Sequence, residues 1–248
     1  MPDPIFSNPR LADIYDLLDP DRTDLDVYLA IVEEFEARSV LDIGCGTGTF
    51  ACMLAGRGID VTGVDPANAS LDVARQKQNA RRVRWVLGDA SRLPPIQVDM
   101  ATMTGNVAQV FLTDADWSQA LRGIHSALRP HGRLIFEVRN PAKQAWRDWN
   151  REKTYRRTNI AGVGAVETWC DVTSVVGDLV AFRWTHVFES DGATVSSDSV
   201  LRFRRREEVE FSLEEAGYAL QEVRDALDRP GLEFVFVAER CEKTTDWD

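Results

Sequence analysis

The sequence is poor in the residues that build metal centres and disulfides. Its few cysteines and histidines are dispersed, with no CxxC spacing: Cys45, Cys52, Cys170 and Cys241, and His125, His131 and His186. A structural zinc site needs such residues in close pairs, so the scatter argues against one. We expect no bound metal, and reduced thiols as in a cytoplasmic protein.

Features of membrane and nucleic-acid proteins are also missing. No apolar run approaches the ~20 residues of a membrane span, and the first residues do not resemble a secretory signal. Lys and Arg number 29 against 40 Asp and Glu, a net charge of −11. An acidic chain gains little from phosphate contacts, which argues against a nucleic-acid partner. We expect a soluble, cytoplasmic protein with a small-molecule partner, no nucleic acid and no membrane, as a monomer or a homodimer.

Short β-branched runs alternate with amphipathic, helix-length stretches between residues 39 and 139. Strands are predicted at 39–43, 60–64, 83–87, 99–103 and 133–138, and helices at 11–18, 25–36, 49–57, 68–80 and 114–128. Thr113, with Asp116 three residues later, is a variant of the capping box that starts a helix. Repeated strand–helix–strand units with right-handed crossovers predict a parallel, doubly wound α/β sheet.

A different pattern follows Asn140. Three alternating runs with hairpin turns between them lie near 165–176, 179–189 and 194–204, before a helix at 207–216 and strands near 219–224 and 233–240. We therefore predict an antiparallel β insertion over 141–206, within an α/β domain made of 1–140 and 207–248. The arginines at its end, Arg202, Arg204, Arg205 and Arg206, are predicted to form a solvated strand-to-helix junction.

The strongest local signal is Val40-Leu41-Asp42-Ile43-Gly44-Cys45-Gly46-Thr47-Gly48-Thr49-Phe50. A buried strand runs into a turn with three glycines at alternate positions, and the turn opens a helix. Glycine allows positive φ there and lets a ligand approach the backbone closely. The nicotinamide fingerprint is GxGxxG, whereas this turn is GxGxG with Thr49 at the third-glycine position. The spacing therefore disfavours a nicotinamide cofactor.

Two acidic residues follow the next two strands. Asp65 ends the second strand, where a carboxylate can accept both ribose hydroxyls of an adenosine. Asp89, just after the third strand, can reach an adenine amine, and the Ala90 amide can donate to the ring. Each acid alone would also fit a helix cap or a solvated loop. Their succession behind GxGxG predicts an adenosine site.

Together, residues 42–50, 61–66, 88–90 and 127–134 resemble the successive motifs of class I S-adenosylmethionine-dependent methyltransferases, over roughly residues 39–139. The resemblance implies a Rossmann-like seven-stranded sheet with its last strand antiparallel. It implies S-adenosylmethionine, with its product S-adenosylhomocysteine, across the carboxyl ends of the strands. The cofactor-binding residues that it implies are Asp42, Gly44, Cys45, Gly46, Gly48, Asp65, Pro66, Asp89, Ala90, Thr104, Gly105 and Asn106.

The segment Thr104-Gly105-Asn106-Val107-Ala108-Gln109 follows the fourth strand, and in this family it passes between the methionyl group and the acceptor. It lacks the Asn/Asp-Pro-Pro-aromatic motif of nucleic-acid amino methyltransferases. It also lacks the acidic pair with which catechol-type O-methyltransferases bind magnesium. We expect a metal-independent mechanism on a small molecule. A solvated turn is the alternative for Asn106.

The acceptor-pocket candidates are Tyr15, Asn106, Glu137, Arg139 and Trp146. Tyr15 lies in a segment that resembles the lid helix of small-molecule methyltransferases, within N-terminal lid helices over 1–38, although a core aromatic fits as well. Glu137 and Arg139 point the same way from the fifth strand, where a mutual ion pair is as consistent as a substrate contact. No residue is assigned as a general base, so the catalytic residue is unknown.

The insertion over 141–206 resembles the antiparallel cover of small-molecule N-methyltransferases. The predicted activity is in-line methyl transfer from S-adenosylmethionine to an amine nitrogen of a small molecule. An O-methyltransferase is the first alternative, and a module that binds the cofactor or its product without catalysis is the second. A nicotinamide oxidoreductase is disfavoured by GxGxG and Asp89.

Overall fold

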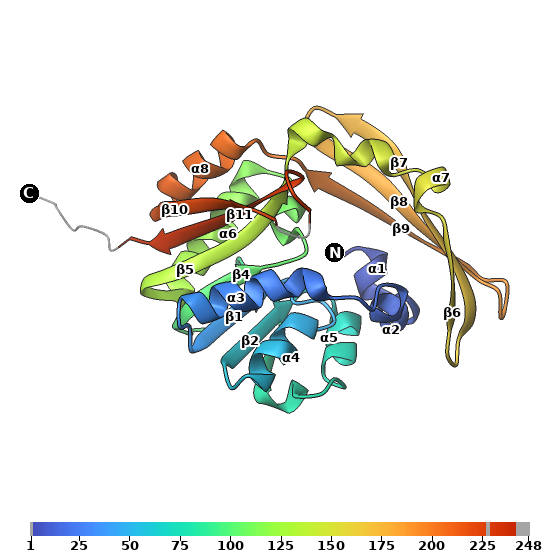
Figure 1. The fold of residues 1–248 in the computed structure, drawn as a ribbon, viewed down its shortest axis with the longest axis horizontal. Helices are drawn as coiled ribbons and strands as arrows, with labels where there is room; N and C mark the ends of the chain where they lie inside the picture. Colours follow the sequence, from blue (N-terminus) through green and yellow to red (C-terminus); the bar gives the residue numbers. More distant parts are fainter. Residues whose placement is uncertain (1, 227–228, 242–248) are drawn as a thin grey trace, which may run out of the picture.

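The computed structural model describes residues 2–226 and 229–241 and contains two β-sheets (Figure 1). Sheet A has seven strands in the order β10-β11-β5-β4-β1-β2-β3. They are β1 (Ser39–Ile43), β2 (Asp60–Asp65), β3 (Val83–Leu87), β4 (Val98–Met103), β5 (Leu128–Arg139), β10 (Tyr218–Asp225) and β11 (Glu233–Arg240). The strands β1 to β5 are parallel to one another, and β11 runs antiparallel to both β5 and β10. The predicted seven-stranded sheet with an antiparallel last strand is confirmed.

Helices cover both faces of sheet A. They are α3 (Asp26–Glu34), α4 (Thr49–Gly56), α5 (Asn68–Ala74), α6 (Asp114–Ala127) and α8 (Arg206–Glu215). One core packs α6 and α8 on the sheet through Trp117, Leu213 and Phe136, and the other packs α3 and α4 on the opposite face. The Thr113 hydroxyl caps α6 by accepting from the Asp116 amide at 3.1 Å, as the sequence predicted. Helix α5 ends at Ala74, six residues earlier than expected.

Sheet B is the antiparallel insertion. Its strands lie in chain order, β6 (Arg156–Ile160), β7 (Gly164–Val176), β8 (Leu179–Phe188) and β9 (Thr194–Arg202), after the short helix α7 (Arg151–Thr154). All pairs of neighbouring strands are antiparallel. In the sequence, sheet B is inserted between β5 and β10, the fifth and sixth strands of sheet A. The predicted class of fold is thereby confirmed, with β6 as a strand that the sequence pattern had not indicated.

The N-terminal helices α1 (Pro4–Ser7) and α2 (Pro9–Leu18) lie between sheet B and α5 (Figure 1). Leu11 and Ile14 of α2 form a small core with apolar residues of β6, β7 and β8. On the other side, the Ser70 hydroxyl of α5 donates to the Phe6 carbonyl at 2.9 Å. The two N-terminal helices therefore contact sheet B on one side and α5, which covers sheet A, on the other. In the described part of the chain, no helix combines the length and apolar character needed to cross a membrane.

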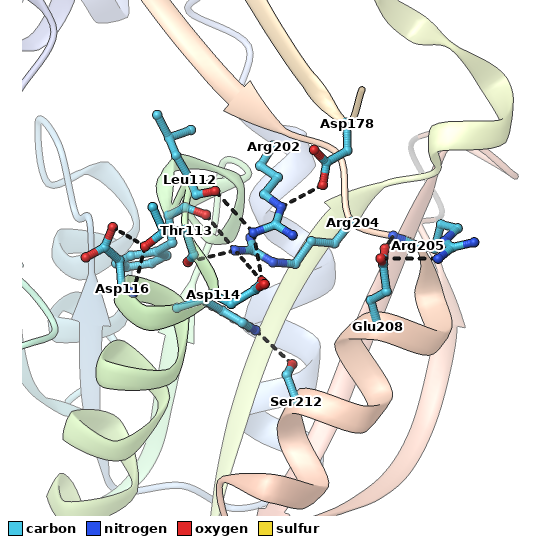
Figure 2. Close-up of polar contacts among 12 residues, drawn as sticks. Leu112, Thr113, Asp114, Asp116, Asp178, Arg202, Arg204, Arg205, Glu208 and Ser212 are labelled. Carbon is cyan, nitrogen blue, oxygen red and sulfur yellow. Dashed lines mark hydrogen bonds and ion pairs between the residues drawn. The ribbon is translucent and has the colours of Figure 1, made fainter. Parts of the chain in front are cut away.

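The end of β9 is tied to sheet A by Arg204, whose side chain is buried (Figure 2). Its Nη2 donates to the carbonyl oxygens of Phe111 at 2.7 Å and Thr113 at 3.2 Å. Burial lowers the pKa of Arg204 to about 10, and the charge of Arg202 acts in the same direction. The expected solvated junction is wrong for this residue, because backbone carbonyls from a distant segment receive its hydrogen bonds in place of water.

Arg202 makes a second set of contacts to the same segment (Figure 2). It donates to the Leu112 carbonyl at 3.1 Å and pairs with Asp114 and Asp178, each at 2.7 Å. The next two arginines do form exposed pairs with glutamates of α8. The junction is therefore buried where it meets the residues before α6 and solvated beyond them.

Short 3-10 turns complete the connections: Thr23–Leu25, Ala80–Arg82, Val107–Val110 (η3), Pro141–Lys143 and Ala145–Asp148. Of these, η3 matters most for the site, since it follows β4 at the carboxyl edge of sheet A.

Candidate functional site

The glycine turn after β1 is shaped for close approach of a ligand. Gly46 has φ +53°, and a Cβ built on it would meet no atom within 4 Å. A Cβ on Gly44, by contrast, would lie 2.5 Å from a methyl carbon of Val107 in η3. Gly44 thus lets the segment after β4 pack on the turn, whereas Gly46 presents bare backbone to open space. These are the two roles that a cofactor-binding turn requires of its glycines.

Asp65 at the end of β2 holds that turn. Its two carboxylate oxygens accept from the Gly46 amide at 2.8 Å and the Ala67 amide at 2.7 Å. Burial raises the pKa of Asp65, and the two amide hydrogen bonds oppose the rise. Each oxygen keeps a second acceptor position for a ligand hydroxyl. Pro66, which follows, is exposed.

Asp42 lies in β1 just before the turn, and Cys45 is part of the turn. Asp42 is buried, and burial raises its pKa to about 7. Its Oδ1 accepts from the Thr102 hydroxyl at 3.1 Å, but Oδ2 has no hydrogen-bond partner among the described residues. Burial also raises the pKa of the Cys45 thiol well above its usual range. Asp42 therefore offers a buried acceptor that a donor from a ligand would satisfy.

The predicted adenine contacts lie after β3. Asp89 is exposed, and its Oδ1 accepts from the amide of Ser91 at 2.8 Å and from the hydroxyl at 2.5 Å. Ala90 is buried, and a Cβ on Gly123 of α6 would lie 2.1 Å from its carbonyl oxygen. Helix α6 thus packs directly on this loop, while the Asp89 carboxylate stays accessible.

The segment after β4 is held by buried carboxylates. Thr104 is half-buried and Gly105 is exposed, with no atom within 4 Å of a Cβ built on it. Asn106 has φ +63° and is 3% exposed, which excludes the solvated turn. Its amide donates to Glu137 Oε1, and its Nδ2 donates to Glu233 Oε1 at 3.2 Å. Asn106 Oδ1 has no partner among the described residues.

Glu137 and Arg139 have separate partners. The Tyr28 hydroxyl donates to Glu137 Oε2 at 2.5 Å, and burial raises the pKa of Glu137 to about 7. The Nη1 of Arg139 donates to Gln109 Oε1 at 3.1 Å, and its Nε lies 3.7 Å from Glu233 Oε1. The ion pair considered between Glu137 and Arg139 is thus replaced by one between Arg139 and Glu233.

Three residues of this network were missed by the sequence reasoning: Tyr28, Gln109 and Glu233. Each is buried and each contributes a polar group to the strand ends. Glu233 is the first residue of β11, and a carboxylate directly before a run of five apolar residues is the signal that could have indicated it. Tyr28 and Gln109 carry no comparable signal in the sequence.

The aromatic candidates lie at the rim. Tyr15 is half-buried with its ring centroid 5.7 Å from that of Phe6, and burial raises its pKa. Trp146 packs on Phe203 with centroids 4.5 Å apart. Trp149, which was not singled out, has the guanidinium of Arg139 5.4 Å from its ring centroid. The glycine turn, Asp65, Asn106, Glu137 and Arg139 thus gather at one edge of sheet A, while Trp146 contacts Phe203, which follows β9 of sheet B.

Part of the amino-acid sequence is similar to those of known proteins. Residues 40–132 match the family described as the methyltransferase domain. Cypemycin N-terminal methyltransferase of a Streptomyces species is 32% identical over 148 residues, which cover 58% of this chain. The chain spans 60% of the length of that relative.

Two solved structures resemble nearly the whole chain. The CcbJ methyltransferase from Streptomyces caelestis has 22% identity and a TM-score of 0.76, covering 94% of this chain and 96% of its own. The sugar N-methyltransferase KedS8 from a Streptoalloteichus species has 21% identity and a TM-score of 0.76, covering 92% and 93%. Residues 40–132 therefore match the methyltransferase domain, and the fold of the chain is that of class I S-adenosylmethionine-dependent methyltransferases.

Proposed function

We propose that the chain is an enzyme that transfers a methyl group from S-adenosylmethionine to a small-molecule acceptor, with an amine nitrogen favoured. The observation that carries the proposal is the glycine turn, where Gly46 faces open space and is bonded to Asp65. The turn lies beside two buried acceptor oxygens without partners, Asp42 Oδ2 and Asn106 Oδ1. The proposal includes a cytoplasmic location.

The hydrogen-bonding groups of the site fit this cofactor. S-adenosylmethionine carries an ammonium group and two ribose hydroxyls, and the site offers acceptor oxygens to match. Asp65 would receive the hydroxyls, and Asp42, with help from the turn, would receive ammonium hydrogens. Asp89 and Ala90 would bind the adenine edge. A cation beside Asp42 would lower the pKa of its carboxyl, because an opposite charge stabilises the ionised form.

The cofactor supplies an electrophilic methyl group on a sulfonium, and this chain's residues orient the acceptor and exclude water. Both oxygens of Glu137 already receive hydrogen bonds, from Tyr28 and Asn106. We therefore assign Glu137 the task of fixing the segment after β4. Asn106 Oδ1 is then an acceptor for an N–H of the substrate or cofactor.

Sheet B and α2 would cover the acceptor. Arg139, held by Gln109, and the ring of Trp149 lie where β5 leads into the insertion. Grafted segments at the carboxyl ends of strands supply specificity in folds of this kind. Under this division the insertion over 141–206, with Tyr15 and Trp146, shapes the acceptor pocket, and sheet A holds the cofactor.

Nitrogen is favoured over oxygen on two grounds. KedS8 is named as a sugar N-methyltransferase, and the cypemycin relative is named as an N-terminal methyltransferase. The side-chain oxygen of Asn106, which has no partner among the described residues, is an acceptor that suits an amine hydrogen. O-methylation is the second candidate, and a non-catalytic module that binds S-adenosylhomocysteine is the third.

The test combines binding with turnover. Calorimetry should detect binding of S-adenosylhomocysteine, with NAD as the control ligand. Labelled S-adenosylmethionine should then transfer its methyl group to members of a panel of small amines. Transfer to alcohols or phenols alone would favour the O-methyltransferase, and binding with no transfer would favour the module. Absence of S-adenosylhomocysteine binding would overturn the proposal.

A further inference from the structure

One carboxylate, that of Asp16 on α2, joins three segments that are distant in sequence. Its Oδ1 accepts from the hydroxyls of Thr47 at 2.8 Å and Thr49 at 3.3 Å. Its Oδ2 accepts from Lys77 Nζ, just beyond α5, at 2.5 Å. Lys77 also donates to Thr49 at 2.6 Å and to Thr47 at 3.2 Å. We call these four residues the Asp16 clasp.

The clasp is placed on the cofactor turn itself. Thr47 and Thr49 flank Gly48, and Thr47 directly follows Gly46, the glycine that faces open space. The side chains of Lys77 and Asp16 are 23% and 25% exposed, so water screens the pair less than an ordinary surface pair. The hydroxyls complete the coordination of both charges. Helix α2 is therefore hydrogen-bonded to the turn through Asp16.

Helix α2 has a second anchor at its other end. Arg10 makes two hydrogen bonds to Asp191, at 2.8 and 3.0 Å, in the hairpin between β8 and β9. This pair is more exposed, with side chains 36% and 51% accessible, and its two hydrogen bonds do not involve the glycine turn. Tyr15, the acceptor-pocket candidate, precedes Asp16. The helix thus spans from the turn to sheet B, and the clasp is its attachment at the cofactor end.

We propose that Asp16 is a positioning residue that fixes α2 over the glycine turn, so that the cofactor pocket is closed on that side by a preformed contact. The proposal rests on the proposed function. Every contact of the clasp joins two groups of the protein itself, so the position of the helix does not depend on a contact with the cofactor. If the clasp is broken, the closed arrangement is less populated, and the apparent dissociation constant rises in proportion. Because α2 then no longer holds the pocket closed over the bound ligand, most of the change in affinity should be an increase in the dissociation rate.

The experiment measures S-adenosylhomocysteine affinity and dissociation rate by stopped flow, with melting temperature alongside. Asp16→Asn and Lys77→Met each remove the charge pair from a different segment. Each should raise the dissociation constant about tenfold, the effect expected for losing charged hydrogen bonds. The double variant should lose little more than either single one, because both act on one contact. Arg10→Gln, which releases the other anchor of the same helix, should stay within about twofold.

The outcomes separate the two proposals. If the unaltered protein does not bind S-adenosylhomocysteine, the proposed function fails. If it binds, and Asp16→Asn and Lys77→Met keep the same affinity and dissociation rate, the role of the clasp is refuted. An equal loss in Arg10→Gln would refute it as well, because the effect would then belong to the stability of α2 as a whole.

Discussion

Asp42 and Glu137 are carboxyl groups buried in strands of sheet A, and burial raises the pKa of each to about 7. A raised pKa means that the folded state binds more protons than the unfolded state between the ordinary value and pH 7. The stability that each group contributes is therefore full below its ordinary pKa and is lost as the pH rises through 7. Both groups therefore contribute less to the stability of the folded state at pH 7 and above than they do in acid.

Glu137→Gln should remove one of these titrations. A change from 4.5 to about 7 corresponds to about 3 kcal/mol. The free energy of unfolding of the variant, relative to the unaltered protein, should rise by up to that amount between pH 4.5 and 7.5. Urea unfolding across this range measures it. Glu207→Gln, at an exposed position of α8, is the control and should show no such trend. A difference that is the same at every pH would contradict the assignment.

Asp65→Ala tests the cofactor end of the site. The carboxylate holds the Gly46 and Ala67 amides and would bind the ribose, and hydrogen bonds to a charged group contribute roughly 1.5–3 kcal/mol each. The dissociation constant of S-adenosylhomocysteine should rise at least about tenfold by calorimetry. Asp72→Ala, on the exposed side of α5, is the matched control. Equal affinity in a folded Asp65→Ala protein would remove Asp65 from the site.

The sequence predicted residues whose role depends on local geometry and missed those whose role depends on distant partners. The glycines after β1 and Asp65 sit in a strand–turn–helix unit that is readable from spacing alone. Glu233 contacts Asn106 across 127 positions, and Tyr28 contacts Glu137 across 109. No local pattern encodes such pairs, because they exist only once sheet A has brought β11 and α3 to its carboxyl edge.

Among the elements, the junction between β9 and α8 depends on Arg204. Arg204→Met keeps the stem of the side chain but leaves the carbonyls of Phe111 and Thr113 without their donor. Breaking buried hydrogen bonds to a charge should lower the free energy of unfolding by about 2–4 kcal/mol. Arg206→Met, which breaks only an exposed pair with Glu210, should cost about 0.5 kcal/mol or less. Similar denaturation midpoints for the two variants would show that the buried contacts contribute little.

The pattern of apolar residues predicted strands with a buried face and failed for β6. Its residues Arg156, Arg157, Thr158 and Asn159 are polar, and only Ile160 is buried. An edge strand with both faces largely in water needs no alternation, so no periodic signal exists. Helix α5 shows the opposite error. The helix was predicted to continue to residue 80, but residues 75–79 are all polar, and the chain leaves the helix after Ala74 and places Lys77 in the Asp16 clasp.

For the whole molecule, the prediction is that activity survives a chelator. Within residues 2–226 and 229–241, no group of three or more His, Cys, Asp or Glu side chains is arranged to hold a metal ion. The segment after β4 also lacks an acidic pair. Methyl transfer to an amine found in the panel should therefore be unchanged in EDTA. Loss of turnover that magnesium restores would show that a divalent cation takes part.

The contacts of Arg202 and Arg204 also bear on how such a protein could be recombined. The residues of sheet B are inserted in the sequence between β5 and α8. Residues 141–206 therefore look like a block that could be exchanged between homologous chains. Both arginines, however, donate to carbonyls of residues 111–113, outside that block. A chimera joined at the ends of the insertion would take the two arginines from one parent protein and their carbonyl partners from the other. A working exchange should carry the stretch from Gln109 to Asp114 together with the insertion.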